Sequence, residues 1–317
     1  MGTSSILRSW AAKDPQAAGD HFVNKVLGSS GEQWQMERTA RSVASEWVRQ
    51  DPDAALAWSL ALPEEVRGDA LEGVIEHLAG DNPMKAAEVA LTLPEDSQAN
   101  ALESVADQWA RTDPAAATAW ANSLEGEARD RALEEALQGW AYNDPGGATA
   151  YLEGISDAEE KDGLLPDVAS RWARRDTESA AAAADWVTTQ SDGAGKSRAM
   201  GEVVGTWLRS DPTAASTWLG TQPEGEAKDS GIVSLLGNRE VREDPGTATA
   251  WAESISDPKL RGEQVYSTTK RWMASDREAA AGYIESNGVL SQEQKVELLN
   301  LTAEELKPAR RGFRGRF

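Results

Sequence analysis

The stretch Trp109-Ala-Arg-Thr-Asp113-Pro114-Ala-Ala-Ala-Thr-Ala-Trp120 decides the fold, because it encodes the end of one helix, a tight turn and the start of the next. Asp113 suits the N-cap position, where its carboxylate accepts free backbone N–H groups of the first helical turn. Pro114 falls at the first helical position, where a missing N–H costs nothing. The alanines that follow favour a helix and let a neighbouring helix approach closely. The stretch therefore predicts a junction between two helices, with Trp120 on a buried face.

Imperfect copies of this junction recur along most of the chain. The copies share an Asp or Asn at the cap position, and seven of the nine continue with proline: Asp14, Asp51, Asn82, Asp113, Asp144, Asp176, Asp211, Asp244 and Asp276. Successive anchors are 31 to 37 residues apart, which is typical of two-helix solenoid repeats. The sequence predicts an all-α fold, a superhelical α-solenoid of about nine two-helix repeats. We expect it to form a single domain over residues 1–306.

Apolar spacing and helix-start signals agree with this pattern. The second helix of each unit carries a stripe of apolar residues at helical spacing, in the clearest units Leu71, Val74, Ile75 and Leu78; Leu102, Val105, Ala106 and Trp109; Leu133, Ala136, Leu137 and Trp140. Two later helices begin with the spacing of a capping box, Ser156 with Glu159 and Ser291 with Gln294. Each stripe predicts one buried face per helix.

The 13 tryptophans are mostly in phase with the anchors. Seven stand four residues before an anchor (Trp10, Trp47, Trp109, Trp140, Trp172, Trp207 and Trp272), and four stand seven residues after one (Trp58, Trp120, Trp218 and Trp251). Such phasing predicts packing between helices. Trp34 and Trp186 are out of phase, and they are the tryptophans that we expect to contact a ligand.

The formal net charge of −21 disfavours nucleic acid or an anionic membrane as a partner of the body of the chain. Basic partners fit better. Carboxylates recur on the turns that precede the second helices: Glu64, Glu65 and Asp69; Glu95 and Asp96; Glu125, Glu127 and Asp130; Glu224, Glu226 and Asp229. Stacked repeats would align these turns into an acidic edge. Arginines gather before the anchors instead, at Arg49, Arg111, Arg174, Arg209 and Arg242. Helix-dipole matching and solubility alone also explain both trends.

Residues 307–317 form a separate basic tail rich in glycine, arginine and phenylalanine, with five cations and no acid. Such mixtures dock on acidic surfaces, RNA or lipid headgroups, or simply form a flexible end. The tail could also bind the acidic body of its own or a neighbouring molecule. The residues expected to bind a partner are Arg310, Arg311, Phe313, Arg314, Arg316 and Phe317.

No catalytic or cofactor motif stands out. The chain has no cysteine and only two histidines, His21 and His77, so we expect no metal site and no cofactor. Gly193-Ala-Gly195-Lys196-Ser197 resembles part of a phosphate loop, but Gln190 occupies the position of the first glycine. No apolar run is long enough for a transmembrane helix. The compartment stays open: the chain is cytoplasmic as written, or exported if a signal sequence was removed.

The spacing of large and small residues resembles the tetratricopeptide repeats. Trp120, Ala136 and Trp140 have the spacing of the family's aromatic, alanine and second aromatic positions. The same spacing separates Val89, Val105 and Trp109, and also Trp58, Val74 and Leu78. The units are shorter, and the first helix lacks the family's Leu-Gly and Tyr positions. The chain also resembles Trp-Ala-x-x-Asp-Pro-x-x-Ala arrays of bacterial α-solenoids. The resemblance implies protein binding.

Together these patterns favour a non-enzymatic scaffold whose concave face or acidic edge holds a protein or peptide, expected to be basic. The alternative is a structural protein that assembles head to tail through its repeat ends or basic tail. An all-helical carbohydrate-active enzyme with paired carboxylates is a third hypothesis. The acidic pairs follow helix starts rather than interrupting the pattern, which favours the first two.

Overall fold

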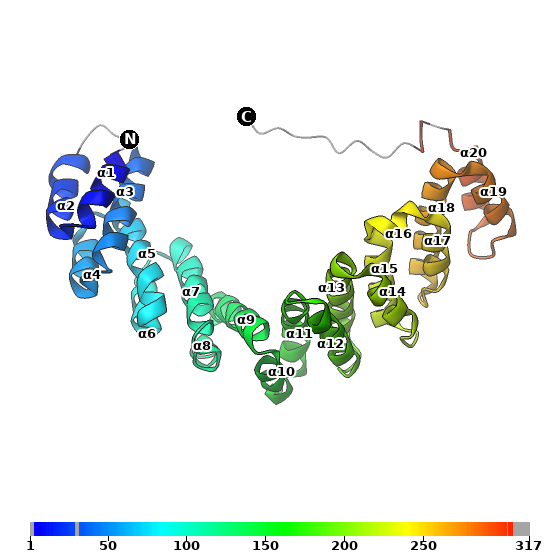
Figure 1. Cartoon of the computed structure of the whole chain (residues 1–317), viewed down its shortest axis with the longest axis horizontal. Coiled ribbons are helices and arrows are strands. Elements are labelled where there is room, and N and C mark those ends of the chain that lie inside the picture. The colour runs from blue at the N-terminus through cyan, green and yellow to red at the C-terminus, as the bar shows by residue number, and fades with distance from the viewer. Residues whose placement is uncertain (1–2, 29–31, 303, 307–317) are drawn as a thin grey trace. The chain divides into compact units, whose positions relative to one another are not determined.

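The computed structural model of the chain describes residues 3–28, 32–302 and 304–306, and these residues form an all-α fold. They contain twenty α-helices and one π-helix, with no β-strand in this described part (Figure 1). The chain divides into two compact units, Met1–Ala148 and Thr149–Phe317. The predicted continuity of one domain over residues 1–306, and its winding into a superhelical solenoid, stay predictions.

The first unit is built from alternating shorter and longer helices. They are α1 (Thr3–Ala11), α2 (Pro15–His21), the π-helix η1 (Phe22–Val26), α3 (Gln33–Trp47), α4 (Pro52–Ala61), α5 (Glu64–Asp81), α6 (Pro83–Ala90), α7 (Glu95–Ala110), α8 (Pro114–Ala121) and α9 (Gly126–Asn143). Helix α10 (Pro145–Gly154) begins in this unit and ends in the next. Each of α3, α5 and α7 packs against the next long helix, so the long helices form one layer.

The second unit continues the alternation. Its helices are α11 (Ala158–Ala173), α12 (Thr177–Thr188), α13 (Ala194–Ser210), α14 (Pro212–Gly220), α15 (Glu226–Gly237), α16 (Arg239–Glu243), α17 (Pro245–Glu253), α18 (Pro258–Ser275), α19 (Arg277–Ser286) and α20 (Gln292–Asn300). Helix α13 packs against the long helices α11 and α15 (Figure 1). It also packs against the short helices α12 and α14, which precede and follow it in the chain.

The predicted N-caps are confirmed at all nine anchors. In each case the anchor side chain accepts a hydrogen bond from the backbone N–H three residues later; the Ala54 N–H donates to Asp51 at 3.0 Å, and the Ala116 N–H donates to Asp113 at 3.0 Å. The capping box at Ser291 and Gln294 is also confirmed. The one predicted at Ser156 is wrong, because Asp157 caps α11 by accepting from the N–H groups of Glu159 and Glu160.

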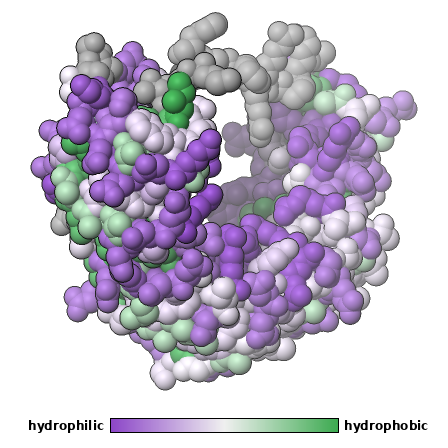
Figure 2. Space-filling view, turned by 60° about the vertical axis from the view of Figure 1, so that its left-hand side comes forward, coloured by the Kyte–Doolittle hydropathy of each residue, from purple (hydrophilic) through white to green (hydrophobic). Residues whose placement is uncertain are grey.

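The predicted apolar stripes are confirmed as core. Eleven of the twelve stripe residues are buried, and Trp140 is half-buried. On the face shown in Figure 2, hydrophilic side chains predominate and hydrophobic ones are scattered. Burial of the apolar stripes between layers of helices is the main stabilising term for such a fold. No helix in the described part of the chain is long and apolar enough to cross a membrane.

Most of the in-phase tryptophans form ring pairs across the anchors. The residue four before an anchor contacts the aromatic residue seven after it, with ring centroids 5.7 Å apart for Trp47 and Trp58 and 5.6 Å apart for Trp109 and Trp120. Further pairs have the same spacing in sequence: Trp10 with His21, Trp207 with Trp218, and Trp272 with Tyr283. His21 thus stands where other hairpins have a tryptophan or tyrosine. Rings four residues before and seven residues after an anchor therefore hold together the two helices that meet at that anchor.

The helix that precedes the anchor Asp244 is broken. Helix α15 ends at Gly237, and Asn238 starts the short α16 by accepting from the N–H groups of Glu240 and Val241. The Asn238 amide also donates to the Leu208 carbonyl oxygen of the neighbouring helix at 3.2 Å. The break coincides with the one anchor of this unit that lacks a tryptophan four residues earlier, where Glu240 stands instead.

The tyrosine of α18 makes folding sensitive to alkaline pH. The Tyr266 hydroxyl donates to the Glu297 carboxylate at 2.6 Å, and burial together with this bond raises the pKa of Tyr266 to about 12. In the unfolded chain this hydroxyl ionises near pH 10. Its stabilising contribution is therefore complete below about pH 10 and is lost as the pH rises through 12. Raising the pH from about 9 to about 11.5 should lower the urea midpoint of unfolding in the parent chain, and it should lower the midpoint of Tyr266→Phe by less. Equal decreases in the two proteins would contradict a stabilising role of the Tyr266 hydroxyl.

Candidate binding groove

The residues predicted to bind a partner fall into three groups. Arg310, Arg311, Phe313, Arg314, Arg316 and Phe317 lie outside the described residues. Trp34, in the first turn of α3, has 54% of its surface exposed, and its indole N–H donates to the Glu32 carboxylate. Trp34 is thus available for contact, although no described groove is built around it.

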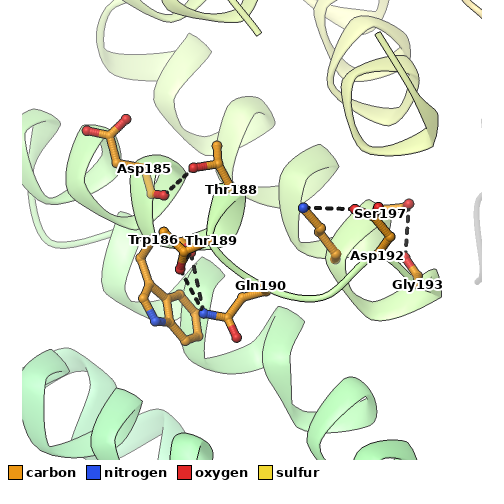
Figure 3. A network of polar contacts seen from close by, with 9 residues as sticks. Asp185, Trp186, Thr188, Thr189, Gln190, Asp192, Gly193 and Ser197 are labelled. Atoms are coloured by element: carbon orange, nitrogen blue, oxygen red, sulfur yellow. Dashed lines mark hydrogen bonds and ion pairs between the residues drawn. The ribbon is translucent and has the colours of Figure 1, made fainter. Parts of the chain in front are cut away.

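Trp186 lies near the C-terminal end of α12 and packs against the core of the second unit. Its ring contacts Trp172 at a centroid distance of 6.2 Å. The Trp186 carbonyl oxygen accepts from the Thr189 hydroxyl at 2.7 Å and from the Gln190 amide at 3.5 Å (Figure 3). Trp186 therefore pairs with Trp172 although it stands three residues, about one helical turn, after the usual aromatic position. Its ring is half-buried, so it exposes less surface to a ligand than Trp34 does.

The loop after Trp186 leads into α13 and holds the residues that resemble a phosphate loop. The Lys196 ammonium pairs with the Asp192 carboxylate at 2.9 Å, and the Ser197 hydroxyl donates to the Gly193 carbonyl oxygen at 3.1 Å (Figure 3). A hollow of about 440 Å³ opens beside this loop, with Lys228 on its other wall. Lys228 donates to the Gln222 carbonyl oxygen at 2.8 Å. Both ammonium groups already have partners within the chain, so this hollow is a weaker anion site than its lysines suggest.

The carboxylates of the predicted acidic edge differ in their surroundings. Glu64 and Glu65 are exposed at the start of α5. Glu127 pairs with Arg131 at 2.8 Å, which neutralises its charge locally. Asp229 does not belong to an exposed edge, because it is only 3% exposed and accepts hydrogen bonds from the turn before α18. The side chains of Glu95 and Asp96 lie outside the described set.

Two adjoining hollows run along the long helices of the second unit. The first, of about 620 Å³, lies over α13 and α15, and the second, of about 380 Å³, lies over α15 and α18. Val233 lines both hollows and is one of the exposed apolar residues of the chain. Small residues contribute much of the lining: Gly201, Gly205, Ser230, Ser234, Gly237 and Ser267. Because small side chains leave room above the helices, these residues explain why the surface is hollowed here.

Five arginines border these hollows, and we call the whole surface the arginine groove: Arg174, Arg198, Arg209, Arg242 and Arg271. Glu202 is the one acidic residue of the described lining. Arg209 donates to the Gly205 carbonyl oxygen at 3.1 Å and to the Thr206 hydroxyl at 3.1 Å, so neither contact neutralises its charge. Within the described ranges, Arg174, Arg198 and Arg242 have no ion pair.

Arg271 of α18 is the most enclosed of the five. Its guanidinium is within 3.5 Å of two carbonyl oxygens, those of Ser267 and Leu236. Burial, and secondarily the positive charge of Arg242, lower the pKa of Arg271. The guanidinium groups of Arg242 and Arg271 thus repel each other at one end of the groove. An anionic group bound there would offset this repulsion.

The arginines of the first unit behave differently. Arg41 of α3 pairs with Glu72 and with Glu76 of α5, the latter at 3.7 Å. Further pairs join Arg8 to Glu46, Arg49 to Glu46, Arg111 to Asp107, Arg129 to Asp130 and Arg131 to Glu127. Most arginines of the first unit are therefore neutralised by carboxylates of the same unit, whereas no ion pair of a groove arginine is found in the described ranges.

Three of the groove arginines, Arg174, Arg209 and Arg242, were noted in the sequence as residues at helix ends. Arg198 and Arg271 were missed. The available signal was the run of small residues at helical spacing, Gly201 and Gly205 on α13 and Ser230 and Ser234 on α15. In the described ranges, no three His, Asp or Glu side chains are grouped so that they could hold a metal ion.

Comparison with known proteins does not name a family. No protein-family model and no curated protein matches the chain. A solved structure described as the crystal structure of an engineered protein is similar over 96% of this chain and 95% of its own, with 16% identity and a TM-score of 0.28. At these values the similarity carries no argument about fold or function.

Proposed function

We propose that this chain is a non-enzymatic interaction scaffold, and that it holds a segment of another protein along the arginine groove. One observation carries the proposal: two adjoining hollows with small residues in their lining follow one layer of long helices in the second unit. A groove on a helical surface is one of the recurring places where a peptide binds. The resemblance to tetratricopeptide repeats supports the same function.

The other functions expected from the sequence have less support. A basic partner on the acidic turns stays a prediction, and Glu127 and Asp130 of that set are already paired with arginines. Self-assembly through the basic tail depends on residues 307–317, which lie outside the described ranges. A carbohydrate-active enzyme would need two carboxylates that face each other across its substrate. The described lining of the arginine groove has one carboxylate, that of Glu202.

Filling the groove is expected to abolish peptide binding. Gly205 lies in the middle of α13, and an added Cβ would meet only Ser234 atoms at 3.7 Å, so Gly205→Leu fits the backbone while its larger side chain occupies the hollow. Peptides selected from a displayed random library on the full chain should bind Gly205→Leu at least tenfold more weakly. Fluorescence anisotropy of the synthesised peptides measures the change.

Gly163→Leu is the matched control. Gly163 lies in α11 of the same unit with open space around it, and it does not line the groove. Its variant should bind the selected peptides as the parent chain does. A library that yields no binder, or binders that both variants retain equally, would contradict the proposed function.

A further inference from the structure

The arginine groove reverses the charge balance of the chain. The whole sequence has 53 acidic residues against 32 lysines and arginines, whereas the described lining of the groove has five arginines and one glutamate. In a chain with this excess of carboxylates, arginines would readily form ion pairs, as most of them do in the first unit. Most of the residues that line the groove beside these arginines are small, apolar or uncharged, and the one carboxylate, Glu202, stands four residues after Arg198 on α13.

We infer that the arginine groove binds an extended acidic segment of a partner protein, whose side-chain carboxylates pair with the groove arginines. This inference rests on the proposed function and names the chemistry of the partner. A guanidinium group binds a carboxylate through two parallel hydrogen bonds, which gives geometric specificity as well as charge attraction. Complementary charge also speeds the encounter with an acidic segment.

The spacing of the arginines suggests the spacing of the carboxylates. Arg198 and Arg209 lie eleven residues apart on α13, and both line the first hollow. At 1.5 Å per residue they are separated by roughly 16 Å along the helix axis. An extended peptide covers this distance with about five residues. Val233, exposed between the two hollows, is placed to contact an apolar side chain of the peptide.

Other occupants fit the groove less well. The segment 307–317 of the chain carries the same sign of charge as the groove arginines, so they would repel each other. Single-stranded nucleic acid is anionic, but its bases need aromatic side chains to stack on. The described lining of the arginine groove contains no aromatic residue. A polypeptide with acidic side chains matches both the charge and the absence of stacking partners.

The test compares three labelled probes on the full chain by fluorescence anisotropy. The first is a peptide of about twelve residues, with glutamates about five residues apart and serine and valine between them. The second has glutamine in place of each glutamate, and the third is an oligothymidylate of similar length. We expect the acidic peptide to bind at least tenfold more tightly than either of the others, and more weakly at high salt.

Two triple variants of equal charge separate the groove from the net charge of the chain. Arg198→Gln, Arg209→Gln and Arg242→Gln together should weaken binding of the acidic peptide at least tenfold. Arg49→Gln, Arg111→Gln and Arg131→Gln, which remove the same charge from paired arginines of the first unit, should change it less than twofold.

The outcomes distinguish this inference from the proposed function. If the acidic and glutamine peptides bind equally, and Gly205→Leu abolishes both, the groove binds peptides without selecting acidic ones, and the inference is wrong. Tighter binding of the oligothymidylate, or equal losses in the two triple variants, would also overturn it. If no probe binds and the random library yields no binder, both the inference and the proposed function fail.

Discussion

Replacing Asp229 with alanine is expected to destabilise the second unit by about 3 kcal/mol, because it removes a buried carboxylate from three donors. The Asp229 carboxylate accepts from the Ser256 N–H at 2.8 Å, the Ser256 hydroxyl at 2.7 Å and the Asp257 N–H at 2.9 Å. These bonds join α15 to the turn before α18, the two helices over which the second hollow of the arginine groove lies. The variant leaves the two backbone N–H groups without their acceptor and should loosen the groove as well as the turn.

Asp257→Ala is the matched control for Asp229→Ala. Asp257 is exposed and caps α18 by accepting from the Leu260 N–H at 2.6 Å, so its loss should cost about 1 kcal/mol. Because folded proteins open locally as well as globally, hydrogen exchange of the amides in α15 and α18 is the appropriate measurement. Protection should fall much further in Asp229→Ala than in Asp257→Ala. Equal losses would show that Asp229 contributes no more than an ordinary helix cap.

Helix starts could be predicted from the sequence because their signals are local. Asp113, Pro114 and the alanines after them specify a cap, a first helical residue and a helix within a few positions, and all nine such anchors are caps in the structure. The error at Ser156 has the same local origin, since Asp157 next to it is an equally good cap and accepts two N–H groups instead of one.

The environment of Asp229 could not be predicted, because its partners are 27 and 28 residues away in sequence. It stands in an acidic turn like those at Glu64 and Glu127, and only the approach of the next turn buries it. Composition alone also does not determine whether an arginine forms an ion pair with a carboxylate. The packing of α5 beside α3 brings Glu72 to Arg41, whereas α15 brings Ser230 and Ser234 to the hollow that Arg198 lines.

The position of Trp186 shows the limit of counting from an anchor. Three residues earlier, at the position where other units place an aromatic residue, Ala183 is fully buried. A shift of three residues on a helix keeps a side chain on nearly the same face. Trp186 therefore reaches Trp172 although it is out of phase in sequence. Trp186 thus forms the same kind of ring pair as the in-phase aromatic residues, although its sequence spacing from the anchor is different.

Replacing Trp207 with alanine is expected to destabilise the second unit by roughly 3–5 kcal/mol, the usual cost of removing a large buried aromatic side chain. Trp207 is 5% exposed and lies in the core of this unit, with its ring 5.8 Å from that of Trp218. The Trp218 indole N–H is held by the Asp185 carboxylate at 2.8 Å, so the partner ring cannot easily move into the space left by Trp207. A cavity should therefore remain.

Trp207→Phe and Trp34→Ala test the same argument from two sides. The Trp207 indole N–H is buried and has no hydrogen-bond partner among the described residues, so phenylalanine loses ring area but no polar contact and should cost only about 1 kcal/mol. Trp34→Ala removes an exposed ring and should change the free energy of unfolding by less than about 0.5 kcal/mol. Urea unfolding followed by circular dichroism compares the three variants. A small effect of Trp207→Ala would mean that the ring pairs do not stabilise the hairpins, and the tryptophans would then need another role, such as contact with a ligand.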